Sequence, residues 1–202
     1  MSAFLGPIHY WLYNKIGNQE KLTAELANLA EKKEWIKKAE DYTKKLPELE
    51  SVIDEGNIHG WLQGQIHDAE ERYAQLVTDI LKDGDHVGEL EKEAYSFGKS
   101  NSIKGAADCQ EAYRAFEDFF VNGMPCDHIN QLTESNADCF AWRQLEDIHA
   151  SYWTKRGSSS EIYYRLREKV MQGMLKDSGF LLEETGDGYK IYKKYKVVKL
   201  CI

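Results

Sequence analysis

Apolar residues recur at helical spacing through most of the first 121 residues, and this pattern restricts the chain to a fold built mainly from helices. The clearest stretch extends from about residue 58 to residue 82, where apolar side chains three and four positions apart define one face. That face consists of Leu62, Ile66, Ala69, Tyr73, Leu76, Val77 and Ile80. An earlier helix is predicted near Pro7, because proline fits the first turn of a helix, and later ones near residues 89–97 and 107–121. We therefore expect residues 1–121 to form a helical bundle.

The pattern changes after Asn122, and the strongest β signal lies near the C-terminus. Residues 180–184 and 189–193 are rich in aromatic and apolar side chains and flank a turn that contains two glycines, which predicts a β-hairpin. Residues 139–145 alternate large and small side chains; this pattern fits a strand or a helix, and we favour the strand.

Together these features predict a mainly α fold of the α+β type, a helical bundle with a small antiparallel sheet or hairpin near the C-terminus. Residues 122–202 are expected to pack on residues 1–121 as one compact domain. A chain of 202 residues can bury about 70% of the surface that its unfolded form exposes, so it needs neither a metal nor disulfides for stability.

Composition excludes several classes of protein. The chain has 34 acidic and 26 basic residues and a net charge of −8, the wrong sign for a general nucleic-acid binder. No apolar run is long enough to span a bilayer, and the first ten residues do not resemble a secretion signal. The four cysteines form no C-x-x-C pair. We therefore expect a cytoplasmic protein with reduced thiols and no membrane partner.

Two five-residue segments resemble each other at an offset of 50 residues: residues 8–12 read Ile-His-Tyr-Trp-Leu and residues 58–62 read Ile-His-Gly-Trp-Leu. Helical spacing places each histidine on the same face as apolar residues and, further along, a carboxylate, Glu20 or Glu70. If the two helices pack together, two imidazoles converge inside the bundle, where such folds build metal sites. If their segment is helical, a carboxylate and an imidazole three residues apart, Glu146 and His149, provide a further chelating pair.

We accordingly predict a pocket for a metal ion or a small molecule, walled by tryptophans. Imidazole and carboxylate ligands suit a transition metal such as zinc or iron. The candidate metal ligands are His9, His59, Glu70 and His149. The candidate ligand-binding residues are Trp11, Trp61, Gln63 and Trp153. No catalytic residue is assigned.

Residues 61–71, which read Trp-Leu-Gln-Gly-Gln-Ile-His-Asp-Ala-Glu-Glu, resemble the histidine-bearing helix of metal-binding four-helix bundles of the DinB and hemerythrin types. The resemblance covers this helix in full and extends in part to the first helix. It implies a bundle whose histidines and carboxylates, contributed by several helices, hold one or two metal ions.

Two other classes of function stay open. In the first, His9 and His59 serve packing alone, and the protein is an interaction or regulatory module without catalytic chemistry. In the second, a lysine-rich C-terminal hairpin contacts DNA, although nucleic acid is not the expected partner of so acidic a chain. The lysines concerned are Lys190, Lys193, Lys194, Lys196 and Lys199. A homo-oligomer is compatible with all three interpretations.

Overall fold

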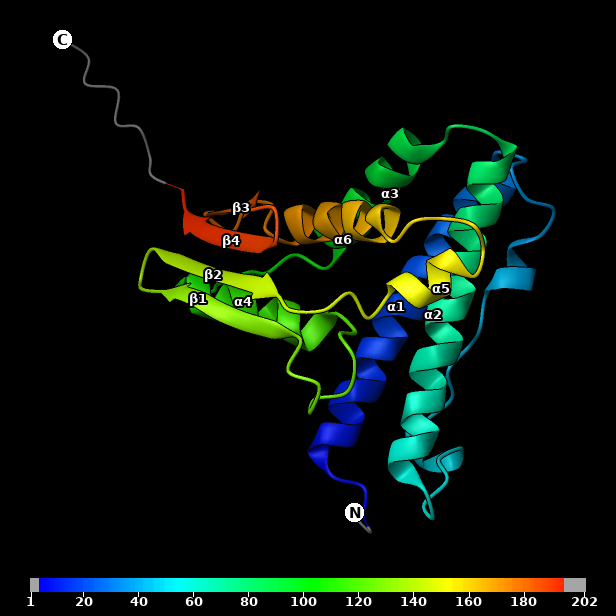
Figure 1. The fold of residues 1–202 in the computed structure, drawn as a ribbon, viewed down its shortest axis with the longest axis horizontal. Helices are drawn as coiled ribbons and strands as arrows, with labels where there is room; N and C mark the ends of the chain where they lie inside the picture. Colours follow the sequence, from blue (N-terminus) through cyan, green and yellow to red (C-terminus); the bar gives the residue numbers. More distant parts are fainter. Residues whose placement is uncertain (1–3, 195–202) are drawn as a thin grey trace.

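The computed structural model describes residues 4–194, and its fold is mainly helical with one four-stranded antiparallel sheet at the C-terminal end of the chain (Figure 1). The predicted fold class is therefore confirmed. Among the described residues, no helix combines the length and the apolar character that crossing a bilayer requires.

Two long helices, α1 (Pro7–Lys32) and α2 (Ile58–Asp83), lie side by side and run in the same direction (Figure 1). This parallel arrangement is possible because residues 33–57, which include the short helices η1 (Ala39–Tyr42) and η2 (Leu49–Ser51), return the chain to the starting end of the pair. Residues 50 positions apart therefore meet in space, and the two similar segments at residues 8–12 and 58–62 become neighbours.

The start of each long helix follows from its local sequence. Pro7 occupies the first turn of α1, where its missing N–H costs no hydrogen bond. Asn57 caps α2, since its side-chain oxygen accepts the N–H of Gly60 at 3.2 Å. Both helices present apolar stripes to each other, and Leu12, Ile16 and Leu62 are almost completely buried between them.

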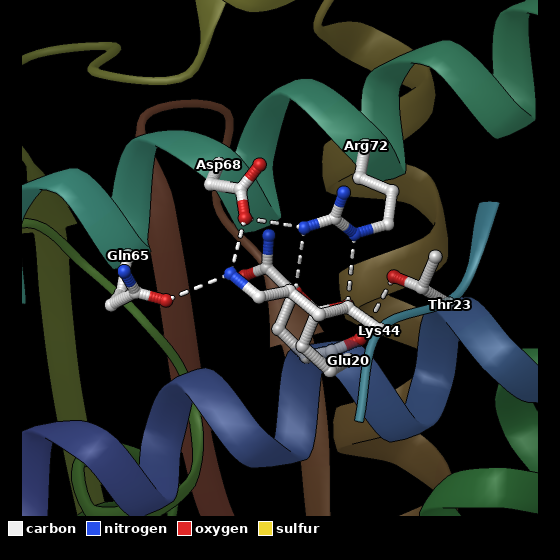
Figure 2. Close-up of polar contacts among 7 residues, drawn as sticks. Glu20, Thr23, Lys44, Gln65, Asp68 and Arg72 are labelled. Carbon is white, nitrogen blue, oxygen red and sulfur yellow. Dashed lines mark hydrogen bonds and ion pairs between the residues drawn. The ribbon is translucent and has the colours of Figure 1, made fainter. Parts of the chain in front are cut away.

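A polar network fixes the middle of the α1–α2 pair and attaches the returning segment to it (Figure 2). The buried carboxylate of Glu20 accepts hydrogen bonds from the Arg72 guanidinium at 3.3 and 3.4 Å. Arg72 also donates to Asp68 at 2.6 Å, and Lys44 of the returning segment donates to Asp68 at 2.6 Å and to Gln65 at 2.9 Å. The network therefore holds three stretches of chain in one register.

The second closely packed helix pair joins the two halves of the sequence. α3 (Val87–Ser100) lies along α6 (Glu161–Met174), and glycines at the crossing let the two backbones approach. A Cβ atom at Gly98 would overlap the carbonyl oxygen of Val170, and one at Gly173 would overlap that of Tyr95. No other residue fits these two positions without moving a helix.

The sheet has the strand order β1-β2-β4-β3, with every neighbouring pair antiparallel. Its strands are β1 (Asn130–Ser135), β2 (Cys139–Gln144), β3 (Phe180–Glu184) and β4 (Gly188–Lys193). The prediction of a strand over residues 139–145 and of the C-terminal hairpin is thus confirmed. Helix α4 (Cys109–Phe119) packs on one face, where the Tyr113 ring stacks on Phe140 with 4.4 Å between ring centroids.

The main hydrophobic core contains residues from both sides of Asn122, where the sequence pattern changes. One cluster of buried side chains combines α1, α2, α3 and α4 with α6 and the sheet. Strand β1 and the short helix α5 (Ala150–Thr154) were not predicted. β1 is an edge strand that is exposed along nearly its whole length, so it carries no alternating apolar signal.

Candidate ligand-binding site

The first predicted pair, His9 and His59, does meet at the starting ends of α1 and α2. Their Nε2 atoms lie 3.4 Å apart. The backbone N–H of Gly6 donates to Nδ1 of His9 at 2.9 Å, so Nδ1 must carry a lone pair and, in neutral His9, the hydrogen sits on Nε2. His9 then donates through Nε2 to Nε2 of His59. This hydrogen bond ties the two helix starts together.

The same hydrogen bonding bears on the predicted metal ion. Two imidazole nitrogens on a tetrahedral zinc stand about 3.3 Å apart, so the spacing alone would fit. However, a metal needs the Nε2 lone pair of His9, and ligating histidines donate rather than accept through the other ring nitrogen. Within residues 4–194, no three or more His, Cys, Asp or Glu side chains are grouped so as to hold a metal ion. A zinc or iron site here stays a prediction.

Three other predicted residues come together in the core, away from the histidine pair. Nδ1 of His149 lies 3.1 Å from Oε2 of Glu70, and the Tyr163 ring stacks on His149 with centroids 3.9 Å apart. Trp153 of α5 contacts the same Tyr163 edge-on. Glu70, His149 and Trp153 are each at most 1% exposed. A ligand cannot reach them without opening the core, so this cluster fastens α5 and α6 to α2.

The remaining predicted residues are spread over the surface. Trp61 is half-buried against Tyr13, with 5.9 Å between ring centroids, and Gln63 points to solvent on α2. Trp11 turns toward α4, where its indole N–H donates to Asp118 at 2.8 Å. The eight candidate residues therefore do not line one common pocket.

The side chain that the sequence reasoning missed is Lys15, which lies one turn after Trp11 on α1. Lys15 is only 3% exposed, and its Nζ atom sits 3.9 Å above the centre of the Trp11 ring. Over the described part of the chain, no carboxylate is within ion-pair distance of this amine and no side chain accepts a hydrogen bond from it. Burial lowers the pKa of Lys15 to about 8, and Glu117 is the group that most opposes this shift.

Lys15 opens onto a pocket of about 200 Å³ between α1, α4 and the loop that leads to β1. We refer to this cavity as the Lys15 pocket. It is lined by Ile8, Trp11, Lys15, Tyr113, Glu117, Asn122, Gly123, Met124, Pro125, His128, Ile129 and Asn130. The loop is fixed by Asp127, whose carboxylate accepts the N–H of Met124 at 2.7 Å.

Hydrogen bonds position the polar groups of the Lys15 pocket. The Glu117 carboxylate accepts from the Tyr113 hydroxyl at 2.8 Å and from the Asn130 amide at 2.9 Å. Arg167, which is itself 9% exposed, donates to the side-chain oxygen of Asn122 at 3.2 Å. The NH₂ group of Asn122 is thereby left as a donor, and no described residue accepts from it. The amine of the buried residue Lys15 and the amide donor of the half-buried Asn122 thus lack acceptors at the same pocket.

The sequence did carry a signal for Lys15. On a helical wheel Ile8, Trp11, Leu12, Lys15 and Ile16 fall on one face, so the pattern places a cation in an apolar stripe. A lysine at such a position either turns its amine out to water or buries it, and here the residue is buried with its side chain at the wall of the pocket between α1 and α4.

A larger cleft, of about 530 Å³, lies between the start of α6 and the turn between β3 and β4. Six carboxylates line it, from Glu146, Asp147, Glu161, Glu168, Glu184 and Asp187. Five of the six residues are exposed, so water solvates their charges and no ligand is required. The Lys15 pocket is therefore the stronger candidate.

The lysines suggested for DNA contact are partly neutralised. Lys190 lies 3.4 Å from Glu134, and Lys193 lies 3.9 Å from Asp138. Lys196 and Lys199 lie outside the described residues.

Comparison with known proteins found no matching family model, no similar curated protein and no similar solved structure.

Proposed function

We propose that this protein binds a small carboxylate-bearing molecule in the Lys15 pocket. The observation that carries the proposal is the buried Lys15 amine, which has no carboxylate within ion-pair distance in residues 4–194. Burying a charged group without a partner is unfavourable, and a carboxylate in the pocket would supply the missing counter-charge and hydrogen bonds.

The acidic residues near Lys15 do not take this role. Glu117 already accepts hydrogen bonds from Tyr113 and Asn130, and Asp118 accepts one from Trp11. A second buried cation, Arg167, adds positive charge from behind Asn122. The polar groups that lack a partner at the pocket are thus hydrogen-bond donors, which an anionic ligand requires.

The size and walls of the pocket restrict the ligand further. A volume of about 200 Å³ is below the ~300–1,000 Å³ typical of sites for drug-sized molecules, so the ligand has only a few non-hydrogen atoms. The Trp11 face and Ile8 offer apolar contact for its carbon atoms.

The proposal can be tested by isothermal titration calorimetry with lactate at pH 7. Lactate carries one carboxylate on a three-carbon body. We expect a Kd of about 1 mM or tighter, from the affinity that a six-atom ligand can reach. Lys15→Met should weaken binding at least tenfold, because it removes the amine and keeps the length of the side chain.

Lys21 provides the matched control, since it lies on the same helix but is exposed. Lys21→Met should bind lactate as the wild type does. Equal affinity in wild type and Lys15→Met, or no measurable heat with wild type, would contradict the proposal.

A further inference from the structure

We infer that Lys15 is a nucleophile that forms an imine with the carbonyl carbon of a small aldehyde or ketone held in the Lys15 pocket. This inference rests on the proposed function, because the pocket that takes the carboxylate also holds the amine. When Lys15 is neutral, the Asn122 NH₂ group and the charge of Arg167 remain for the carboxylate. It adds to that function a covalent step and a second functional group on the ligand, a carbonyl.

The geometry is that of an available nucleophile. Nζ of Lys15 is held 3.9 Å above the Trp11 ring, whose own orientation is fixed by the hydrogen bond from its indole N–H to Asp118. The amine is buried at the wall of a cavity and not inside the packed core. When the amine is neutral, no group among residues 4–194 donates a hydrogen bond to its lone pair.

The chemistry requires no reagent besides the carbonyl compound. The neutral amine attacks the carbonyl carbon, a C–N bond forms, and the C=O π pair moves to the oxygen. A proton passes from nitrogen to oxygen to give a carbinolamine. Loss of the hydroxyl group with one more proton then produces the C=N bond and one water molecule.

The surroundings favour the neutral amine at moderate pH. Desolvation lowers the pKa of Lys15 to about 8, and the charge of Arg167 acts in the same direction. Glu117 and Asp118 of α4 act in the opposite direction and restrain the shift. His128 is the remaining titratable imidazole at the pocket wall. At pH 8 an amine with this pKa is about half neutral, which is roughly a hundredfold more than an ordinary lysine.

Proton transfers in the carbinolamine steps also have a candidate carrier. Glu117 lines the pocket and shares hydrogen bonds with the Tyr113 hydroxyl and the Asn130 amide. These hydrogen bonds hold the carboxylate at the pocket wall, where it can accept a proton from the attacking nitrogen and return one to the leaving hydroxyl.

The test is reductive trapping. The full-length protein is incubated at pH 8 with pyruvate and sodium cyanoborohydride, which converts an imine to a stable secondary amine, and the modified lysines are located by peptide mass spectrometry. Lys15 should be modified about a hundredfold faster than an ordinary exposed lysine such as Lys21, by the ratio of neutral amine. Modification spread evenly over the lysines would overturn the inference.

Comparing lactate binding with pyruvate trapping separates this inference from the function on which it rests. Lys21→Met leaves the Lys15 pocket unchanged, so it should bind lactate and trap pyruvate on Lys15 as the wild type does, whereas Lys15→Arg should lose the trapped product. If wild type binds lactate but pyruvate is not trapped on Lys15, the imine is refuted and carboxylate binding stands. If wild type neither binds lactate nor traps pyruvate, both proposals fail.

Discussion

Replacing Lys15 by methionine should stabilise the protein at neutral pH, which is unusual for a change at a buried position. The pKa of Lys15 is about 8 in the folded state and 10.5 in the absence of the fold, a difference of 2.5 units. At about 1.4 kcal/mol per unit, keeping the amine charged in the folded state at pH 7 costs roughly 3 kcal/mol. The cation–π contact with Trp11 offsets part of this cost, so we expect a gain of about 1–3 kcal/mol for Lys15→Met.

The sign of the pH dependence gives a sharper check. A group whose folded pKa is lowered binds fewer protons when folded, so the wild type gains stability relative to the variant as pH rises from 8 to 10.5. Urea unfolding of both proteins should show the full difference at pH 7 and less than about 1 kcal/mol at pH 10. Lys21→Met should show no such pH-dependent difference. A destabilised Lys15→Met at pH 7, or a difference that does not change with pH, would refute the buried unpaired amine.

Three further changes test the packing described above. Gly98→Ala should destabilise by about 2–4 kcal/mol in thermal unfolding, because its Cβ overlaps a backbone carbonyl that only a shift of α6 can move; an unchanged Tm would contradict the close crossing. Glu70→Leu should cost about 3–5 kcal/mol by leaving His149 unpaired in the core, and adding His149→Phe should restore part of the loss; additive losses would argue against their contact. Arg72→Met should leave the buried Glu20 carboxylate without its ion pair, so the pKa of Glu20, already raised by burial, should rise further. The loss of stability relative to the wild type should then shrink as pH falls toward 5, and a loss independent of pH would argue against this pair.

Most of the fold could be predicted from the sequence because its helices have one apolar face. The helix at residues 58–82 was placed within one residue of α2, since its stripe is uninterrupted and Asn57 and Gly84 stand at its ends. The hairpin was equally clear, because its turn needs a positive φ and Gly186 adopts φ 90°. β1 was missed because the patterns used for prediction depend on buried apolar side chains, and β1 is exposed along nearly its whole length.

The site was harder to predict because the sequence shows which residues share a face but not which faces meet. The repeat at residues 8–12 and 58–62 suggested contact between His9 and His59, and they do meet. Glu70 lies 11 positions beyond His59 on the same helix, about 16 Å along the axis, so it cannot join them. Whether Lys15 is a candidate site residue depends on how α4 packs beside it. The hydrogen bonds between α1 and α4 join residues about 100 positions apart in the sequence.

The parallel course of α1 and α2 has a consequence for the speed of folding. Bundles whose successive helices run up and down form contacts between near neighbours in sequence and fold in microseconds to milliseconds. Here residues of α1 contact residues of α2 that lie 50 positions away in the sequence, and α3 contacts α6 at a separation of 74 positions. Each closure costs chain entropy before its contacts form. This helical chain should therefore fold at the slower pace of mixed α/β domains, with a rate set by topology and not by its helix content.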